Sequence, residues 1–348
     1  MPVNKINISD FLEAHESCPI LDVRSPGEFQ HAHIPGALSF PLFSNNERAE
    51  IGTAYKQVSR ESAIKIGLGY FGTNLVKMVE EAERIVAEKN NGRKEINVHC
   101  WRGGMRSAAV AWLLDLYGFR VNLLTGGYKA FRQNAIRELG NEYNLCVLGG
   151  YTGSNKTGIL QSMQANRAVI DLEALAGHKG SAFGNLDNIQ QPSQEFFENL
   201  LAASLVNCRK KYNEQVIWLE GESQRIGNIN TPKLFSDNMK KSKMIFLKIP
   251  FEQRLDFIVK EYGNYSKEKL IGAIIRIKKR LGGLETKNAV NFLLEDDVKS
   301  CFAILLRYYD KYYLRTINDN EFKNREIIEV HSDTTNASEN LKLILKHA

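Results

Sequence analysis

Short apolar runs alternate with helical stretches through the first 138 residues of the chain. The runs at 19–24, 96–98 and 119–124 have the length and composition of buried strands. Residues 74–89 place apolar side chains at the spacing of a helix, and a second helix is expected over 107–116. Alternation of this kind indicates a parallel α/β sheet, in which ligands bind beyond the carboxyl ends of the strands.

The same alternation resumes after residue 139 and then gives way to helices. Apolar runs at 145–148, 168–172 and 216–219 predict further strands. From about residue 262 the spacing is helical. The pattern therefore predicts an α/β fold class with an α/β domain over 1–138, a second α/β domain over 139–260 and a helical C-terminal extension over 261–348.

The composition is that of an ordinary globular protein. The 348 residues are enough for two domains, and 43% of them are hydrophobic and 25% charged. The five cysteines are scattered without C-x-x-C spacing, which favours a reducing compartment over a disulfide or zinc framework. There is no apolar signal segment and no run of 18 apolar residues, so we expect a cytoplasmic protein with no membrane segment and no metal cluster.

The stretch V-H-C-W-R-G-G-M-R-S-A-A at 98–109 joins a predicted strand to a predicted helix through a glycine-containing loop. Backbone N–H groups and the helix N-terminus would surround the Cys100 sulfur, which predicts a lowered thiol pKa and a socket for a tetrahedral anion. A buried structural cysteine is the commoner fate of a free thiol, but two arginines and two glycines within six residues do not suit an apolar core. The predicted catalytic residues are Cys100, Arg102 and Arg106, and the predicted anion ligands are Gly103, Gly104 and Ser107.

A second glycine-rich loop, G-G-Y-T-G-S-N-K-T at 149–157, follows a short apolar run and precedes a helical pattern. This is the context of a P-loop, in which backbone N–H groups cradle phosphates, Lys156 pairs with them and the Thr157 hydroxyl ligates magnesium. Asn155 replaces the last glycine of the motif, and we expect its side chain to weaken tight nucleotide binding. The predicted diphosphate ligands are Gly150, Gly153, Ser154, Lys156 and Thr157.

Acidic residues follow two of the predicted strands in the second domain. Asp171 and Glu173 end the run that begins at 168, and Glu220 ends the run that begins at 216. Carboxylates at strand ends beside a P-loop commonly hold magnesium. We assign Asp171 and Glu173 to this role, with helix capping as the alternative.

The net charge of +6 is concentrated in one region. Residues 240–280 contain 12 Lys and Arg against 4 Asp and Glu, whereas the rest of the chain contains 34 against 36. Such a region suggests a polyanionic partner, although a solvated helix face explains it equally well. Tyrosines among basic residues at 298–314 would either stack on splayed bases or pack helices. The predicted polyanion contacts are Lys278, Lys279 and Arg280, opposite Ile271, Ile274 and Ile275 on one helix.

Motifs in the first domain resemble the rhodanese family. They are L-D-V-R-S-P-G-E-F at 21–29, H-I-P-G-A at 33–37, the Cys100 loop and G-G-Y-K-A-F-R at 126–132. The resemblance implies a domain that transfers sulfur or selenium at the loop cysteine. The loop is one residue longer than in most single-domain sulfurtransferases, and H-C-x5-R is also the pattern of cysteine-dependent phosphatases. A longer loop suits a phosphate-sized group, such as selenophosphate or a phosphoester.

The chain as a whole, through about residue 260, closely resembles the bacterial tRNA 2-selenouridine synthases. The resemblance implies a rhodanese-like domain followed by a P-loop NTPase-like domain. Beyond the two loops it is carried by F-P-L-F-S-N-N-E-R-A-E-I-G-T-A-Y-K-Q at 40–57, V-I-D-L-E-A-L-A-G-H-K-G-S-A-F-G at 169–184, Q-P-S-Q at 191–194 and P-F-E-Q-R-L at 250–255.

The resemblance also implies a transferase that modifies the wobble uridine of tRNAs for lysine, glutamate and glutamine in two stages. Geranyl diphosphate first alkylates the 2-thio group, and selenium from selenophosphate then replaces the geranylthio group. The P-loop would hold the diphosphate, and Cys100 would accept or position the selenium nucleophile in a selenophosphate site that includes Gly103, Gly104 and Ser107. The basic residues at 278–280 would bind the tRNA backbone.

Two other classes of protein remain open from the residues alone. One is a cysteine-dependent phosphatase fused to a P-loop kinase-like domain, which needs an aspartate general acid that the sequence does not reveal. The other is an RNA-binding module with an inactive rhodanese fold, and the intact Cys100 loop argues against it.

Overall fold

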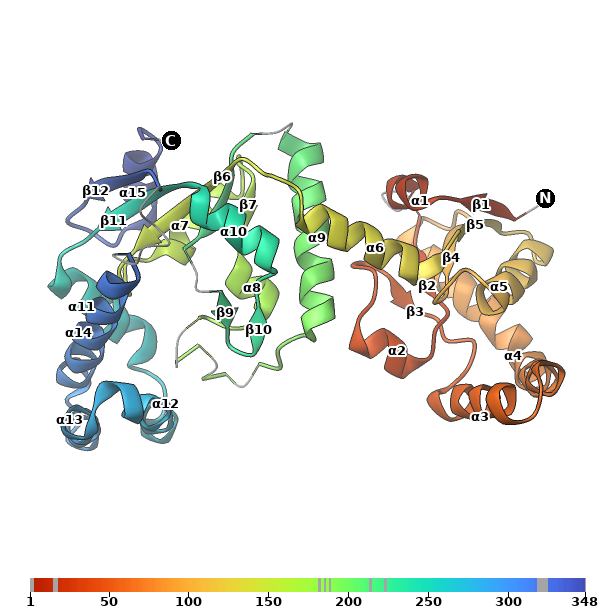
Figure 1. Cartoon of the computed structure of the whole chain (residues 1–348), viewed down its shortest axis with the longest axis horizontal. Coiled ribbons are helices and arrows are strands. Elements are labelled where there is room, and N and C mark those ends of the chain that lie inside the picture. The colour runs from red at the N-terminus through yellow and green to blue at the C-terminus, as the bar shows by residue number, and fades with distance from the viewer. Residues whose placement is uncertain are drawn as a thin grey trace. The chain divides into compact units, whose positions relative to one another are not determined.

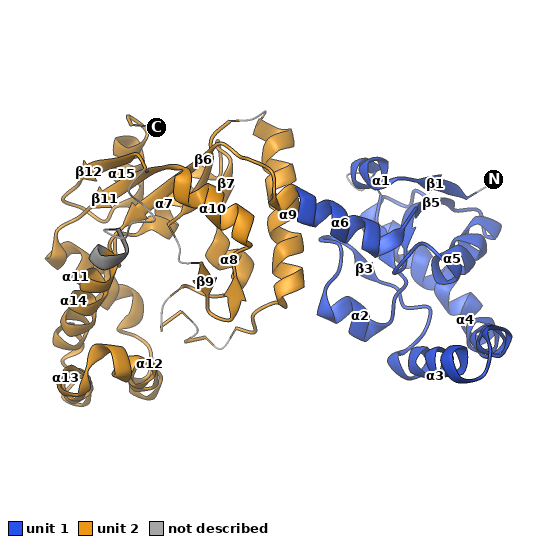
Figure 2. Cartoon of the chain, in the orientation of Figure 1, with its two compact units in different colours: residues 1–137 blue, residues 138–348 orange. Residues whose placement is uncertain are grey.

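A computed structural model of the chain describes residues 3–14, 18–180, 183–184, 186–187, 189–212, 215–221, 224–317 and 325–347, without the side chains of 314–317. Residues 181 and 182 of the motif at 169–184 lie outside this description. The chain forms two compact units, unit 1 (residues 1–137) and unit 2 (residues 138–348), and each is described by itself (Figure 2).

Unit 1 contains a five-stranded sheet. Its strands are β1 (Asn4–Ile6), β2 (Ile20–Asp22), β3 (Leu38–Ser39), β4 (Glu95–His99) and β5 (Arg120–Leu124). They lie in the order β1-β5-β4-β2-β3, and every adjacent pair is parallel (Figure 1). The helices are α1 (Ile8–Ala14), α2 (Pro26–His31), α3 (Asn45–Gln57), α4 (Arg60–Lys89), α5 (Met105–Leu116) and α6 (Gly127–Leu139), the last of which crosses into unit 2.

Local sequence explains where the helices of unit 1 begin and which face they bury. Ser44 and Ser59 cap α3 and α4 by accepting hydrogen bonds from backbone N–H groups of the first turn. The 30-residue helix α4 buries Met78, Ala82 and Ile85 at helical spacing. These residues pack with the apolar side chains of β4, β5 and α5 into one core. Strand β4 and helix α5, which flank the Cys100 loop, therefore both belong to this core.

Unit 2 is built on a second five-stranded sheet. Its strands are β6 (Leu145–Gly150), β7 (Val169–Ile170), β8 (Ile217–Glu220), β11 (Lys243–Lys248) and β12 (Ile327–His331). They lie in the order β12-β11-β6-β8-β7, and all neighbours are parallel (Figure 1). The remaining elements are the helices α7 (Lys156–Met163), α8 (Leu172–Ala176), α9 (Gln194–Tyr212), α10 (Lys233–Lys241) and α15 (Ala337–Ile344), and the hairpin of β9 (Arg225–Ile226) and β10 (Ile229–Asn230).

A group of four helices follows β11. They are α11 (Phe251–Tyr262), α12 (Lys267–Leu281), α13 (Gly283–Leu294) and α14 (Val298–Ile317). Their apolar residues form a core of their own, which includes Leu270, Ile274 and Leu305. The chain then returns to the sheet as β12, beside β11, and the sequence pattern did not predict this strand.

The predicted fold class is confirmed, because both sheets are parallel α/β sheets and a helical region follows strand β11 of the second one. The division into three segments at 138/139 and 260/261 stays a prediction. Within the described part of the chain, no helix is long and apolar enough to cross a membrane. Among the same residues, no group of three or more His, Cys, Asp or Glu side chains is placed to hold a metal ion.

Candidate active sites

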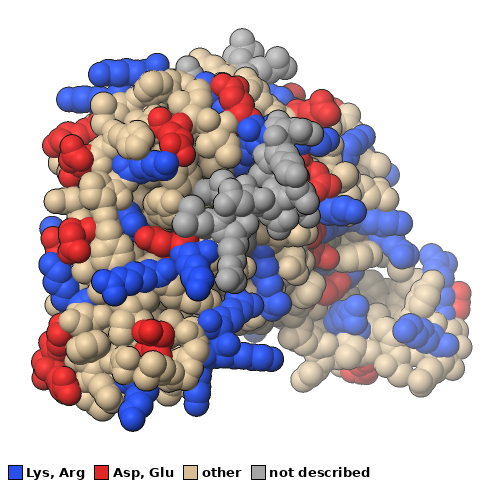
Figure 3. Space-filling view, turned by 60° about the vertical axis from the view of Figure 1, so that its left-hand side comes forward, with Lys and Arg blue, Asp and Glu red and all other residues tan. Residues whose placement is uncertain are grey.

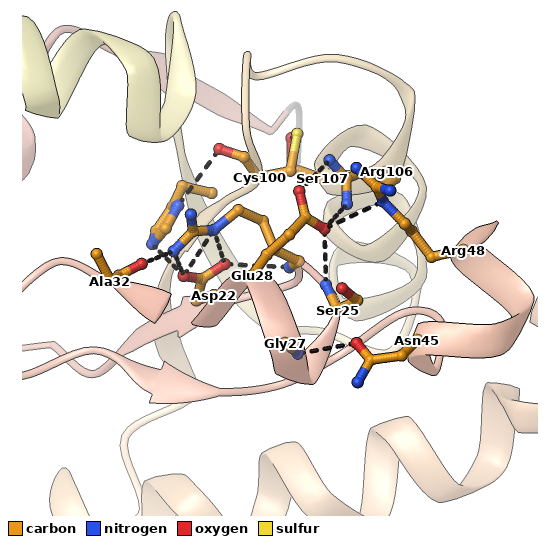
Figure 4. A network of polar contacts seen from close by, with 12 residues as sticks. Asp22, Ser25, Gly27, Glu28, Ala32, Asn45, Arg48, Cys100, Arg106 and Ser107 are labelled. Carbon is orange, nitrogen blue, oxygen red and sulfur yellow. Dashed lines mark hydrogen bonds and ion pairs between the residues drawn. The ribbon is translucent and has the colours of Figure 1, made fainter. Parts of the chain in front are cut away.

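Cys100 lies directly after β4, at the carboxyl edge of the unit 1 sheet, and α5 begins five residues later. The residue is only 3% exposed. The hydroxyl of Ser107, which is buried in the first turn of α5, donates a hydrogen bond of 3.1 Å to the Cys100 sulfur (Figure 4). The fold therefore brings Cys100 together with one of its predicted partners.

The segment after β5 fixes the backbone of the Cys100 loop. The N–H of Tyr128 donates a hydrogen bond of 2.8 Å to the carbonyl of Cys100. Gly127 has a φ of +59°, and a Cβ there would collide with the same carbonyl and lie 2.5 Å from the nitrogen of Gly103. Because only glycine fits so close an approach at this φ, the G-G-Y-K motif at 126–129 holds the loop in place.

Glu28 fixes the side chain of Arg106. Its carboxylate accepts hydrogen bonds of 2.8 and 3.4 Å from the guanidinium, and Arg48 lies 3.8 Å away (Figure 4). Burial works to raise the pKa of Glu28, but Arg106, the backbone N–H of Ser25 and the charge of Arg48 together outweigh it, so the pKa lies below its ordinary value. Glu28 is therefore ionised at neutral pH and positions Arg106 near the loop.

The sequence analysis missed Glu28, although a local signal was present. The run S-P-G-E at 25–28 is a capping box, and in the structure Glu28 accepts a hydrogen bond of 3.1 Å from the N–H of Ser25. The box fixes the orientation of Glu28 at the start of α2. The local pattern does not reveal that Glu28 pairs with Arg106, because Arg106 is 78 residues away in the sequence.

The L-D-V-R motif at 21–24 forms a buried ion pair. Arg24 and Asp22 are at most 1% exposed, with a guanidinium nitrogen 2.6 Å from the carboxylate, and Arg24 also donates to the carbonyl of Ala32. His99 lies 3.7 Å from Asp22, and burial lowers the pKa of His99 below its ordinary value. Because breaking a buried ion pair leaves a costly unpaired charge, we interpret these residues as the support of the Cys100 strand.

The other predicted residues of this site have different surroundings. Gly103 has a φ of +67°, and a Cβ there would lie 2.7 Å from the carbonyl oxygen of Leu124. Gly104 is the N-cap of α5, and Arg102 is exposed. Their role in binding an anion stays a prediction.

The second candidate site is a cavity of about 670 Å³ in unit 2, lined by the loop between β6 and α7. The loop ends at the N-terminus of α7, where the backbone N–H groups of a first helical turn and the helix dipole favour an anion. All five predicted diphosphate ligands line this cavity: Gly150, Gly153, Ser154, Lys156 and Thr157.

Glu220, at the end of β8, is the carboxylate that contacts the P-loop. It is 4% exposed and lies 3.5 Å from the amino group of Lys156. The hydroxyl of Thr157 donates to the other carboxylate oxygen at 3.4 Å. Lys156 also donates to the carbonyl of Gly150 at 3.2 Å. A lysine, a hydroxyl and a carboxylate therefore meet at the floor of the cavity.

Asp171 and Glu173 have different positions. Asp171 is the N-cap of α8, where its carboxylate accepts a hydrogen bond of 2.8 Å from the N–H of Ala174. This is the alternative that the sequence left open. Glu173 lines the cavity. The assignment of these two residues as partner carboxylates of the P-loop stays a prediction, and Glu220 contacts both Lys156 and Thr157.

Asn155 occupies the left-handed region with a φ of +56° and a ψ of +38°. Asparagine tolerates this conformation better than other residues that carry a Cβ, which explains how it replaces the usual glycine. Its side-chain amide donates a hydrogen bond of 2.9 Å to the carbonyl of Thr335, just before α15. The Asn155 side chain therefore joins the P-loop to the segment that precedes α15.

Substitutions at Asn155 test this conformation. We expect Asn155→Ala to lower the free energy of unfolding by about 1–2 kcal/mol more than Asn155→Gly, because alanine is strained in the left-handed region and glycine is not. Both variants lose the hydrogen bond to Thr335, so that loss cancels in the comparison. Denaturant unfolding of the two purified variants measures the difference, and equal stabilities would contradict the conformation.

Arg254, from the P-F-E-Q-R-L motif, braces the same loop. It is 3% exposed, forms two hydrogen bonds of 2.9 and 2.8 Å with Asp310, and donates a third to the carbonyl of Thr152 at 3.1 Å. Gly153 packs against this residue, because a Cβ there would lie 2.8 Å from the carbonyl of Arg254. One positive charge of the basic region thus belongs to the interior of the fold.

The aromatic residues of the C-terminal helices line the cavity. Tyr309, Tyr312 and Tyr313 of α14 and Tyr262 of α11 contribute to its wall. Tyr313 also makes ring contacts with Tyr151 of the P-loop at a centroid distance of 5.8 Å. Of the two explanations for the tyrosine-rich pattern, helix packing and base stacking, the structure shows packing for Tyr262 and Tyr309, which lie against the helical core, whereas Tyr312 is 53% exposed.

Lys278, Lys279 and Arg280 are exposed in the last turn of α12. Figure 3 shows that Lys and Arg side chains are spread over one face of the molecule with acidic side chains between them. The predicted apolar face of α12 is partly wrong, because Ile274 is buried but Ile275 is 55% exposed. Basic side chains also stabilise the C-terminus of a helix through its dipole, so their exposure alone does not assign a partner.

Comparisons with known proteins match both units. Residues 7–134 match the model of the rhodanese-like domain, and residues 143–342 match that of the tRNA 2-selenouridine synthase AAA domain. A tRNA 2-selenouridine synthase of Shewanella denitrificans (strain OS217) is 34% identical over 342 residues, which cover 87% of this chain and 88% of that protein. One of Nitrosomonas eutropha (strain C91) is 33% identical over 300 residues, which cover 84% and 73%.

Proposed function

Given that the chain belongs to the tRNA 2-selenouridine synthase family, we propose that it converts wobble 2-thiouridine to 2-selenouridine in tRNAs for lysine, glutamate and glutamine. The conversion has two stages, S-geranylation by geranyl diphosphate and selenation by selenophosphate. One observation supports the proposal most strongly. A single chain carries a cysteine whose sulfur accepts a hydroxyl hydrogen bond and a P-loop cavity with a lysine at its floor.

The P-loop cavity supports the first stage. The thiocarbonyl sulfur of the uridine attacks C1 of geranyl diphosphate, so that a C–S bond forms, the C–O bond breaks, diphosphate leaves and the uridine loses its N3 proton. Lys156 and the N-terminus of α7 stabilise the charge that develops on the departing diphosphate. The tyrosines of the cavity wall offer an apolar surface to the prenyl chain and aromatic faces to positive charge at C1.

The residues present at the floor of the cavity fit a magnesium ion. The Thr157 hydroxyl and the Glu220 carboxylate lie within 3.4 Å of each other, and Mg²⁺ commonly binds one or two protein oxygens together with substrate phosphates. A bound ion would neutralise part of the diphosphate charge. Thr157 and Glu220 are the residues that would hold it.

The Cys100 loop supports the second stage. The selenium of selenophosphate adds to C2 of the alkylated base, the C–S bond breaks, and geranylthiol leaves with a proton. Water then cleaves the Se–P bond, which releases phosphate and leaves 2-selenouridine. In this scheme Cys100 and Ser107 position the selenium, and Arg106, held by Glu28, pairs with the phosphate group.

A direct assay tests both stages. The purified chain is incubated with 2-thiouridine tRNA and geranyl diphosphate, and selenophosphate is added to half of the reaction. Mass spectrometry of the nucleosides should show geranylthiouridine in the first half and selenouridine in the second. If no geranylthio nucleoside forms while selenouridine does, the first stage of the proposal is wrong.

The basic end of α12 is the proposed contact with the tRNA backbone. Each phosphate contact releases counterions and contributes about −0.7 to −0.9 to the slope of log affinity against log salt. Replacing Lys278, Lys279 and Arg280 by alanine should therefore flatten this slope by about two to three units. The loss should be similar for cognate and non-cognate tRNAs, because backbone contacts do not read sequence.

A matched control removes three exposed charges elsewhere. The triple variant Arg60→Ala, Lys65→Ala and Lys77→Ala changes the net charge equally on α4. If both triple variants change the slope by the same amount, the effect reflects net charge, and the proposed contact between α12 and the tRNA backbone is wrong. Filter binding from low to physiological salt measures all three proteins.

A further inference from the structure

A second concave surface lies in unit 1, and of its lining residues only Arg106 has a role in the proposed function. It is a groove of about 760 Å³ lined by residues of α3, α4 and α5, within the size range of small-molecule sites. Its lining is mostly apolar and includes Phe43, Ile51, Ile64, Leu68, Phe71 and Met105.

The groove and the Cys100 loop share one turn of helix. Met105 and Arg106, at the start of α5, line the groove. Ser107, the next residue, donates its hydrogen bond to the Cys100 sulfur at 3.1 Å. A ligand in the groove therefore lies next to the helix turn that contacts the reactive sulfur.

The surface of the groove favours a ligand that is apolar at one end and anionic at the other. Three of its large side chains are more than half exposed: Tyr55 at 55%, Met105 at 57% and Leu68 at 62%. Gathered apolar side chains in a concavity commonly mark a binding site. Two further basic residues of the same lining, Arg48 and Lys56, suit an attached polyanion.

We propose that this groove binds the geranyl chain of S-geranylated tRNA while selenium replaces the thioether at the Cys100 site. The inference rests on the proposed function, in which the substrate of the second stage carries a flexible apolar chain on its reacting sulfur. Burial of the chain holds that sulfur beside the loop, and the basic rim pairs with RNA phosphates. The groove thus selects the alkylated tRNA over the 2-thiouridine form.

Two glycines provide a matched pair of variants. Gly52 of α3 lines the groove, and a Cβ there would meet no atom within 4 Å. Gly52→Phe therefore fills the groove without a backbone clash and replaces a poor helix former. Gly72 of α4 has the same open surroundings but does not line the groove, so Gly72→Phe is the control.

The test measures binding of two fluorescent anticodon stem-loops, one S-geranylated and one S-methylated, to the full-length chain. The wild-type protein and Gly72→Phe should bind the geranylated RNA at least about tenfold more tightly than the methylated RNA. Gly52→Phe should abolish this preference and leave binding of the methylated RNA unchanged. A preference that survives in Gly52→Phe, or its absence from the wild-type protein, would overturn the proposal.

The same proteins separate this inference from the proposed function. Failure of the wild-type protein to selenate geranylated tRNA would count against the second stage, whereas the binding preference reports the groove without any turnover. A dimer of the wild-type chain that Gly52→Phe dissociates would assign the groove to a second copy of the chain and would likewise overturn the proposal. Circular dichroism and thermal unfolding check that both variants fold.

Discussion

Cys100→Ser is expected to slow selenation strongly and to cause geranylated tRNA to accumulate. Serine is close in size to the nearly buried cysteine, so the fold should persist. The variant lacks the sulfur that positions selenium beside Ser107, and a loss of that positioning should lower the selenation rate by about 100-fold. Geranylation should be unchanged, because it is assigned to the P-loop of unit 2. Mass spectrometry of tRNA nucleosides measures both products.

A second cysteine provides the control for this variant. Cys208 on α9 is also buried, and burial raises the pKa of its thiol. Cys208→Ser should leave both products at the wild-type level. Equal loss of geranylthiouridine and selenouridine in a folded Cys100→Ser protein would contradict the division of the two stages between the two loops.

Lys156→Ala is expected to weaken binding of geranyl diphosphate by about 10- to 100-fold, the usual effect of losing a hydrogen bond to a charged group. The helix N-terminus and the loop N–H groups remain, so binding should not vanish. Geranylation should fall in parallel. Pre-geranylated tRNA should still be selenated at the wild-type rate, because that stage is assigned to unit 1. Isothermal titration with geranyl diphosphate is the measurement.

Loss of Lys156 also has a structural effect that needs its own control. Glu220 is buried and lies 3.5 Å from Lys156, so the single variant leaves a buried carboxylate without this neighbour and should lower the melting temperature. The double variant Lys156→Met and Glu220→Gln removes both charges and should recover stability without recovering affinity. Unchanged affinity in Lys156→Ala would show that this loop is not the diphosphate site.

The sequence predicted both loops correctly as connections between a strand and a helix. Around Cys100 and around Lys156, a short apolar run, a glycine-containing loop and a helical pattern follow one another within about 20 residues. Such signals are local, because strand and helix periods depend only on near neighbours in the chain. The α/β class followed from the same alternation.

Which carboxylate lies beside the P-loop lysine depends on the order of the strands in the sheet. The sequence placed Glu220, as well as Asp171 and Glu173, at strand ends and assigned the partner role to the latter two. In the sheet, however, β8 lies between β6 and β7, so Glu220 of β8 reaches Lys156. Strand order arises from the packing of the whole unit, and hydrophobic period carries no information about it.

Contacts between distant segments likewise required the tertiary structure. Glu28 meets Arg106 across 78 residues, and Asn155 meets the carbonyl of Thr335 across 180. The groove beside Cys100 is formed by three helices, none of which shows it alone. The sequence by itself thus determined which backbone turns present a thiol and a P-loop lysine, because those turns are made by contiguous residues. The tertiary structure decided which charges and apolar surfaces surround them, because burial and ion pairing act through space between residues that the chain keeps far apart.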